Sequence, residues 1–241
     1  MQLKPRLAEV AKCVEPADEV VDIGTDHAYL PVYLIKKGVC RRVIGVEKNQ
    51  QNLEKAQKTV DLFQLRSKIE LRKGDGFFAL TEHDKVEEAV IAGLGGRTIG
   101  NILRSGAGKT QGLRRFVLQP MSDIYLLRRW LLTHGFRISD ERLAREKNHF
   151  YVIITVQHGK QEISDPILLE VGPGLLKNRD PLLIPYLENE IARCQVINRS
   201  LEDAREAGSL KKRDYYLHKE ARLKEVLSIV TAGSKIDGLD E

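Results

Sequence analysis

Residues 19–31 read EVVDIGTDHAYLP, and this stretch decides the expected fold. Its first part, 19–24, is a short apolar run of mostly β-branched residues that ends on a glycine, which is typical of a buried parallel strand. The following run, 28–37 (AYLPVYLIKK), is expected to be helical, with Pro31 near its first turn, where the missing N–H costs no hydrogen bond. A buried strand, a glycine turn and a helix predict the first unit of a parallel α/β sheet.

The same alternation continues along the chain. Apolar and β-branched runs predict strands, and apolar residues at helical spacing predict helices, with Ser122 as one expected N-cap. The further strands are expected at 42–46, 69–72, 86–92, 115–118, 137–143 and 150–157, and the helices at 3–14, 50–63, 97–103 and 122–134. This order predicts a doubly wound, mostly parallel sheet with helices on both faces, whose ligand binds at the carboxyl ends of the strands.

The pattern changes after residue 160, so we expect one domain over 1–160 and a second over 161–241. Residues 172–174 (GPG) indicate a turn-rich connector. Two later runs have apolar residues at helical spacing, and residues 207–209 separate them, which predicts an antiparallel helical hairpin. Such a hairpin could be a binding arm, a dimer contact or a lid over the core, and the sequence does not choose among them.

Charge and composition narrow the class of protein. The 241 residues include 39 Lys and Arg against 34 Asp and Glu, a net charge of +5, which fits a polyanionic partner without requiring one. Cys13, Cys40 and Cys194 form no C-x-x-C pair, so they are expected to be structural thiols in a reducing cytoplasm, and no metal site is expected. We expect no signal peptide and no membrane span. The sequence leaves the oligomeric state open, with a monomer slightly favoured.

The turn after the first strand favours a particular cofactor. Gly24 stands where the first glycine of the dinucleotide fingerprint G-x-G-x-x-G would be, and Asp26 replaces the second. A glycine there lets a ligand approach the backbone closely. The Asp26 carboxylate would repel a pyrophosphate and attract a cation. Because S-adenosylmethionine carries a sulfonium and an amino group, the sequence favours this methyl donor over NAD.

Acids or glycines also follow the next three strands. Glu47 ends the second strand, where a carboxylate can accept hydrogen bonds from both ribose hydroxyls. Asp75, between Gly74 and Gly76, is a candidate acceptor for the adenine amino group, and Gly93 follows the fourth strand. Taken singly, these residues could be turn formers, helix caps, surface charges or plain loop residues. Their coincidence at four strand ends predicts a nucleoside-binding site.

Three runs carry a resemblance to a known family: 22–31 (DIGTDHAYLP), 91–96 (IAGLGG) and 118–120 (LQP). They resemble the bacterial tRNA adenine-22 N1-methyltransferase family. The resemblance covers nearly the whole chain, including the Gly172–Pro173 turn and the helical hairpin after it. One departure is visible, since Met121 stands where we expect Asn, which weakens a role for that position in contacting the base.

The resemblance implies a Rossmann-like class I methyltransferase domain followed by a coiled-coil-like helical domain. It implies methyl transfer from S-adenosylmethionine to N1 of adenine 22 in the D-arm region of tRNA. The implied donor site consists of Asp22, Gly24, Asp26, His27, Glu47, Asp75, Gly76 and Gly93.

Three residues are candidates for work on the target base. Asp26 could orient the adenine amino group or offset the charge that develops on the methylated base, or it could serve only the donor or its own loop. Tyr29 could stack on the base or pack within its helix. Gln119 could hydrogen-bond the base edge through its amide or bond the backbone instead.

Basic residues are expected to hold the tRNA backbone, although each could also be an ordinary surface charge. The candidates are Arg97, Arg128, Arg129, Lys211, Lys212 and Arg213. Two other functions stay open at this point. One is a small-molecule methyltransferase, although such an enzyme needs neither the helical hairpin nor the net positive charge. The other is a non-catalytic RNA-binding protein, although such a protein has no need of the complete set of acids and glycines.

Overall fold

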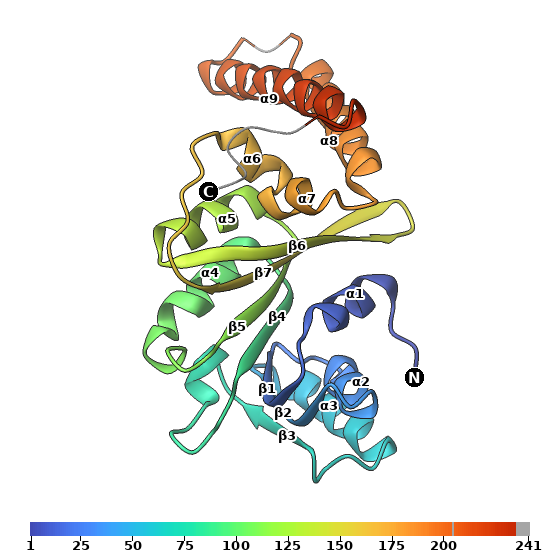
Figure 1. The fold of residues 1–241 in the computed structure, drawn as a ribbon, viewed down its shortest axis with the longest axis vertical. Coiled ribbons are helices and arrows are strands. Elements are labelled where there is room, and N and C mark those ends of the chain that lie inside the picture. The colour runs from blue at the N-terminus through green and yellow to red at the C-terminus, as the bar shows by residue number, and fades with distance from the viewer. Residues whose placement is uncertain (204, 235–241) are drawn as a thin grey trace. The chain divides into compact units, whose positions relative to one another are not determined.

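The computed structural model describes residues 1–203 and 205–234 (Figure 1). The chain divides into two compact units, Met1–Gln161 and a second that begins at Glu162. No helix among the residues described is long and apolar enough to cross a membrane.

The first unit is built on a seven-stranded sheet in the order β3-β2-β1-β4-β5-β7-β6. The strands are β1 (Ala17–Ile23), β2 (Cys40–Glu47), β3 (Ile69–Lys73), β4 (Glu88–Leu94), β5 (Arg115–Pro120), β6 (Phe136–Glu146) and β7 (His149–His158). β1 to β5 are parallel, and β7 is antiparallel to both β5 and β6. The chain reverses its direction of travel across the sheet between β1 and β4, and such a switch point is where open α/β sheets bind ligands.

Helices cover both faces of this sheet (Figure 1). Those of one face are α1 (Pro5–Cys13), α2 (Tyr29–Lys36) and α3 (Gln50–Leu62), and those of the other are α4 (Gly96–Ser105) and α5 (Ile124–Thr133), with the short 3-10 turns η1 (Gly76–Ala79) and η2 (Ala107–Lys109). Asn49 caps α3 by accepting hydrogen bonds from the N–H groups of Gln51 and Asn52. The predicted α/β fold class is confirmed.

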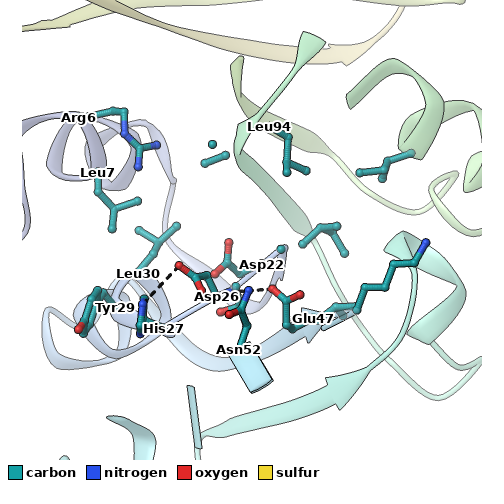
Figure 2. Close-up of a pocket in the computed structure, with 18 of the residues that line it drawn as sticks. Arg6, Leu7, Asp22, Asp26, His27, Tyr29, Leu30, Glu47, Asn52 and Leu94 are labelled. Carbon is teal, nitrogen blue, oxygen red and sulfur yellow. Dashed lines mark hydrogen bonds and ion pairs between the residues drawn. The ribbon is translucent and has the colours of Figure 1, made fainter. Parts of the chain in front are cut away.

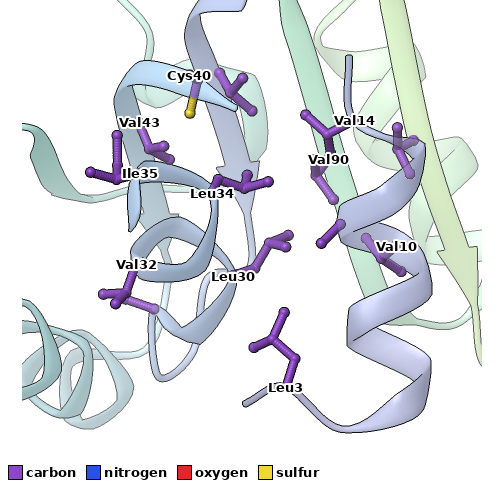
Figure 3. Close-up of a cluster of buried hydrophobic side chains, with 14 of the residues drawn as sticks. Leu3, Val10, Val14, Leu30, Val32, Leu34, Ile35, Cys40, Val43 and Val90 are labelled. Atoms are coloured by element: carbon purple, nitrogen blue, oxygen red, sulfur yellow. The ribbon is translucent and has the colours of Figure 1, made fainter. Parts of the chain in front are cut away.

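The core on the α1 side joins the N-terminal segment to the sheet (Figure 3). Val10 of α1 and Leu34 of α2 are fully buried, as are Val43 and Val90 of the strands beneath them. Burial of each such side chain contributes about 1.5–3 kcal/mol. This packing fixes α1 against the strands that carry the carboxyl-end loops.

The start of α5 differs from the sequence prediction. Asp123 takes the cap position, with a left-handed backbone at φ 54°, and the helix begins at Ile124. Ser122, the predicted cap, instead donates its hydroxyl hydrogen to Asp123 Oδ2 at 3.0 Å. The prediction of a Ser122 cap is therefore wrong by one residue.

The second unit is helical. Its helices are α6 (Pro166–Val171), α7 (Pro173–Asn178), α8 (Leu183–Ser200) and α9 (Ala207–Thr231). α8 and α9 form an antiparallel hairpin, in which Lys219 Nζ lies 3.9 Å from Glu190 and Arg213 donates to the carbonyl of Glu202. Residues 207–209, which we expected to separate the two helices, form the first turn of α9 instead.

Candidate active site

A cavity of about 840 Å³ opens at the carboxyl ends of β1 to β4 (Figure 2). The sequence placed acids and glycines at these strand ends. The structure brings all of the predicted donor-site residues together on this cavity: Asp22, Gly24, Asp26, His27, Glu47, Asp75, Gly76 and Gly93. Four carboxylates on one cavity create a site that favours a ligand with cationic and hydroxyl groups.

Glu47, at the end of β2, is buried with its carboxylate at the cavity. Oε1 accepts a hydrogen bond from Asn49 N at 2.8 Å, and Oε2 accepts one from Asp26 N at 3.2 Å. These backbone donors fix the carboxylate in one orientation. Because an ionised carboxylate has about four lone-pair sites, acceptor capacity remains for two ligand hydroxyls.

Asp22, near the end of β1, is buried beside the same cavity. Burial raises the pKa of its carboxyl to about 6, the nearby hydroxyl of Thr25 lowers that pKa, and the charge of Glu47 raises it. Burial disfavours the ionised form of this carboxyl, and a cation bound beside it would stabilise that form.

The turn after β1 directs three side chains toward the cavity (Figure 2). Gly24 has φ +79°, a conformation that favours glycine, and Asp26 also has a positive φ of 46°. The Asp26 carboxylate is 54% exposed and lies 3.7 Å from His27 Nε2. The ring of His27 stacks on that of Tyr29 at 5.3 Å between centroids, and Tyr29 is 46% exposed.

Asp75 and two glycines complete the acidic side of the site. Asp75 Oδ2 accepts a hydrogen bond from Lys48 Nζ at 2.6 Å, so one oxygen is held by a cation. Gly76 has φ +58°, and a Cβ added there would lie 3.2 Å from Ile102. Gly93 has φ +79°. The backbone conformation thus favours glycine at both turns.

Gln119 does not present its amide to the cavity. It is fully buried, and its Oε1 accepts hydrogen bonds from Arg6 and from Gly93 N, the latter at 3.1 Å. Its Nε2 donates to the carbonyl of Pro120 at 2.8 Å. The predicted contact between Gln119 and a base edge is therefore wrong, because the amide is occupied by neighbouring groups.

The predicted tRNA contacts separate into exposed and buried residues. Arg97 is exposed and lies 3.4 Å from Asp123, and Arg129, Lys211 and Lys212 are exposed, whereas Arg213 is half-buried. Arg128 is fully buried, and its Nε lies 2.7 Å from Glu141 Oε1, which is also buried. The prediction that Arg128 contacts RNA is wrong, because this ion pair lies inside the unit.

Removing Arg128 should destabilise the fold rather than weaken RNA binding. Arg128→Ala leaves the buried Glu141 carboxylate without its main counter-charge, which should lower the free energy of unfolding by about 3–5 kcal/mol. Arg129→Ala is the matched control. Arg129 is the exposed neighbour of Arg128, so its removal should change the free energy of unfolding by less than about 0.5 kcal/mol. Urea unfolding of both variants measures the difference, and equal effects would contradict this account.

Several residues that line the cavity were not predicted from the sequence. Lys48 and Asn52 follow β2, and Arg6 and Leu7 come from α1, together with the chain before it. Lys48 adjoins Glu47 and could have been found from its position. No local signal marks α1, because its residues reach the cavity only through tertiary packing.

Comparison with known proteins identifies the chain. A family model described as TrmK, tRNA (adenine(22)-N(1))-methyltransferase, matches residues 20–225. The chain belongs to this family. The resemblance and the methyltransferase class expected from the sequence are thereby confirmed.

Relatives of this family support the fold and the donor. The tRNA (adenine(22)-N(1))-methyltransferase of Bacillus subtilis is 29% identical over 209 residues, 85% of this chain and 87% of the relative. A Streptococcus pneumoniae structure in complex with S-adenosyl-L-methionine is 33% identical, covers 94% of this chain and 100% of its own, and has a TM-score of 0.83. Mycoplasma capricolum TrmK, in complex with S-adenosyl-homocysteine, is 28% identical over 96% of this chain and 99% of its own, with a TM-score of 0.76. The predicted cofactor, S-adenosylmethionine, is confirmed.

Proposed function

We propose that this cavity transfers a methyl group from S-adenosylmethionine to N1 of adenine 22 in tRNA. The observation that carries the proposal is the convergence of Asp22, Asp26, Glu47 and Asp75 on one cavity, in a chain of this family. A tRNA substrate would place the enzyme in the cytoplasm.

The residues present fit the donor. The fixed carboxylate of Glu47 has acceptor capacity for the two ribose hydroxyls. Asp22 offers a buried carboxylate to the cationic part of the donor, and Asp75 offers an acceptor to the adenine amino group. Gly24 and Gly93 leave the backbone open to close approach on this cavity.

The main contribution of the protein to methyl transfer is to align N1 of adenine with the methyl group of the donor. When bound, the donor supplies an electrophilic methyl group. N1 of adenine has an in-plane lone pair, so a general base is unnecessary, and the chain contributes chiefly by fixing the geometry of attack. Because N1 lies on the Watson–Crick edge, the target base must leave any pairing before it enters the cavity.

Two residues are placed to act on the target base. Asp26 can accept a hydrogen bond from the adenine amino group and offset the positive charge that methylation leaves on the ring. Tyr29 is half-exposed on the cavity and already stacked on His27, so an adenine could extend that stack. Its exposure supports base contact over the alternative of helix packing.

The buried Asp22 predicts a pH dependence of donor binding. A bound cation favours the ionised carboxyl, so protonation of Asp22 in the free protein competes with binding. Since the pKa of Asp22 is raised to about 6, affinity for the donor should be level above pH 6 and fall as the pH drops below it. The loss should approach about tenfold per pH unit.

Calorimetric titration of S-adenosylmethionine between pH 5 and pH 7 checks this expectation. In Asp22→Asn the profile should be flat, with weaker binding at pH 7. A level profile in the native protein, or an unchanged slope in Asp22→Asn, would refute the role given to Asp22.

Exposed or half-buried cations are proposed to hold the tRNA backbone, which fixes the register of the RNA while contacts to the base provide selectivity. The candidates that remain are Arg97, Arg129, Lys211, Lys212 and Arg213. Lys211, Lys212 and Arg213 lie in the first half of α9, so the helical unit is proposed as a tRNA-binding arm.

Labelled methyl transfer separates an RNA substrate from a small molecule. The protein is incubated with methyl-labelled S-adenosylmethionine and either unmodified tRNA, adenosine or adenosine monophosphate. Label should be recovered in the tRNA and not in the two small acceptors. Label in the small acceptors alone would make the chain a small-molecule methyltransferase, and binding of the donor without any transfer would favour a non-catalytic RNA-binding protein.

A further inference from the structure

Arg6 enters the donor cavity from α1, on a side apart from Glu47 and Asn52 (Figure 2). Its Nη1 donates a hydrogen bond to Gln119 Oε1, and its guanidinium carbon lies 5.8 Å from the centroid of the Tyr151 ring. A Cβ built on Gly93 would lie 3.6 Å from Nη1. The side chain is therefore held in place, next to the loop after β4.

The partners of Arg6 are neutral. Gln119 contributes an amide oxygen and Tyr151 an aromatic face, and neither balances the charge of a guanidinium. In residues 1–203 and 205–234, no carboxylate forms an ion pair with Arg6. A half-buried guanidinium has five N–H donors in a fixed fork that matches a carboxylate or a phosphate.

The donor brings one group that the acids of the cavity cannot bind. Its amino-acid end carries a carboxylate beside the ammonium, and Asp22, Asp26 and Glu47 would repel it. Among the cavity's Lys and Arg side chains, Lys48 is paired with Asp75, and Lys4 is exposed. Arg6 is the cation that is both held in position and free of a carboxylate partner in the described part of the chain.

We propose that Arg6 binds the carboxylate of the donor's amino-acid end. Gln119 is the positioning residue that holds the guanidinium, because its Oε1 joins Arg6 to the N–H of Gly93. Ribose and carboxylate lie at opposite ends of the donor, and Glu47 and Arg6 lie apart on the cavity (Figure 2). The inference rests on the donor and not on the RNA target. It also falls outside the stretch that the family model matches, which begins at residue 20.

The test compares two donors that differ in one group. Calorimetry gives the dissociation constants of S-adenosylmethionine and of its decarboxylated form for the native protein, Arg6→Gln and Arg6→Lys. Arg6→Gln should raise the dissociation constant of S-adenosylmethionine by about 10- to 100-fold. It should change that of the decarboxylated form by less than about twofold. Arg6→Lys keeps the positive charge but loses the forked N–H donors of the guanidinium. Its dissociation constant for S-adenosylmethionine should therefore lie between those of the native protein and Arg6→Gln.

Lys12→Gln is the matched control, because Lys12 lies on the same helix, is exposed and pairs with Glu9 rather than facing the cavity. It should leave both dissociation constants unchanged. Equal weakening of both donors in Arg6→Gln would overturn the proposal, since it would show a general distortion of the site. Unchanged binding of both donors, with a raised KM for tRNA and a smaller salt dependence, would also overturn it and assign Arg6 to an RNA phosphate.

Discussion

Asp26→Asn should lower kcat by about 100-fold while the dissociation constant of S-adenosylmethionine changes by less than about threefold. Methylation at N1 leaves adenine with a positive charge, and the half-exposed carboxylate on the cavity is placed to offset that charge. The amide keeps the shape and removes the charge. Asn also tolerates the left-handed backbone that Asp26 adopts at φ 46°, so the turn should survive the substitution.

Asp123→Asn is the control for this experiment. Asp123 has the same type of backbone, at φ 54°, but does not line the cavity. With saturating tRNA and donor, its kcat should equal that of the native protein. Near-normal turnover of Asp26→Asn, with intact donor binding, would show that Asp26 serves only its own loop.

Glu47→Gln should weaken donor binding by about 100-fold. The carboxylate accepts one backbone hydrogen bond on each oxygen, and it is proposed to accept both ribose hydroxyls in addition. The amide has a single acceptor oxygen, and its NH₂ group would face the N–H of Asp26 or of Asn49. The effect should therefore appear in the dissociation constant measured by calorimetry, before any catalytic step.

Glu54→Gln provides the comparison, since Glu54 is an exposed acid on α3 whose carboxylate accepts a hydrogen bond from Gln50 at 3.2 Å. Its donor affinity should be native. The melting temperature of Glu47→Gln without donor reports any damage to the turn. Native donor affinity in Glu47→Gln would remove Glu47 from the ribose site.

The acidic side of the site could be predicted from sequence because each acid lies at or just after the end of a recognisable strand. Parallel strands bring their carboxyl ends to one edge of a sheet, so Asp22, Glu47 and Asp75 had to lie near one another once the strands were recognised. Asp26 was found for the same reason, at the turn after β1. Their roles toward the donor and the base remain proposals, drawn from these positions and from the resemblance to the family.

The burial of Arg128 was not predicted, because it depends on a break in the alternating pattern of β6 that buries its partner Glu141. β6 has a register shift between Ile138 and Asp140. Phe136 and Ile138 are buried before the shift, and Glu141 and Leu143 are buried after it. Glu141 is then buried and faces Arg128. The apolar residues at 136, 138 and then 143 contain this change of phase, and that change is the signal that could have revealed it.

The N-terminal contribution to the site had no local signature. α1 was expected as an amphipathic helix, but which of its polar residues would face a cavity depends on how it packs on the sheet. Arg6 and Gln119 are 113 residues apart in the chain, and only the folded structure brings them together. α6 and α7 were missed for a simpler reason, because each spans only six residues, beside the turn at 172–174.

The identity of the methylated nucleoside tests the central claim most directly. The protein is incubated with S-adenosylmethionine and an unmodified tRNA transcript that has adenine at position 22, and the RNA is digested to nucleosides for mass spectrometry. We predict 1-methyladenosine, absent when position 22 is guanine and lost with Asp26→Ala. A different methylated nucleoside, or 1-methyladenosine that persists in the guanine-22 transcript, would contradict the account.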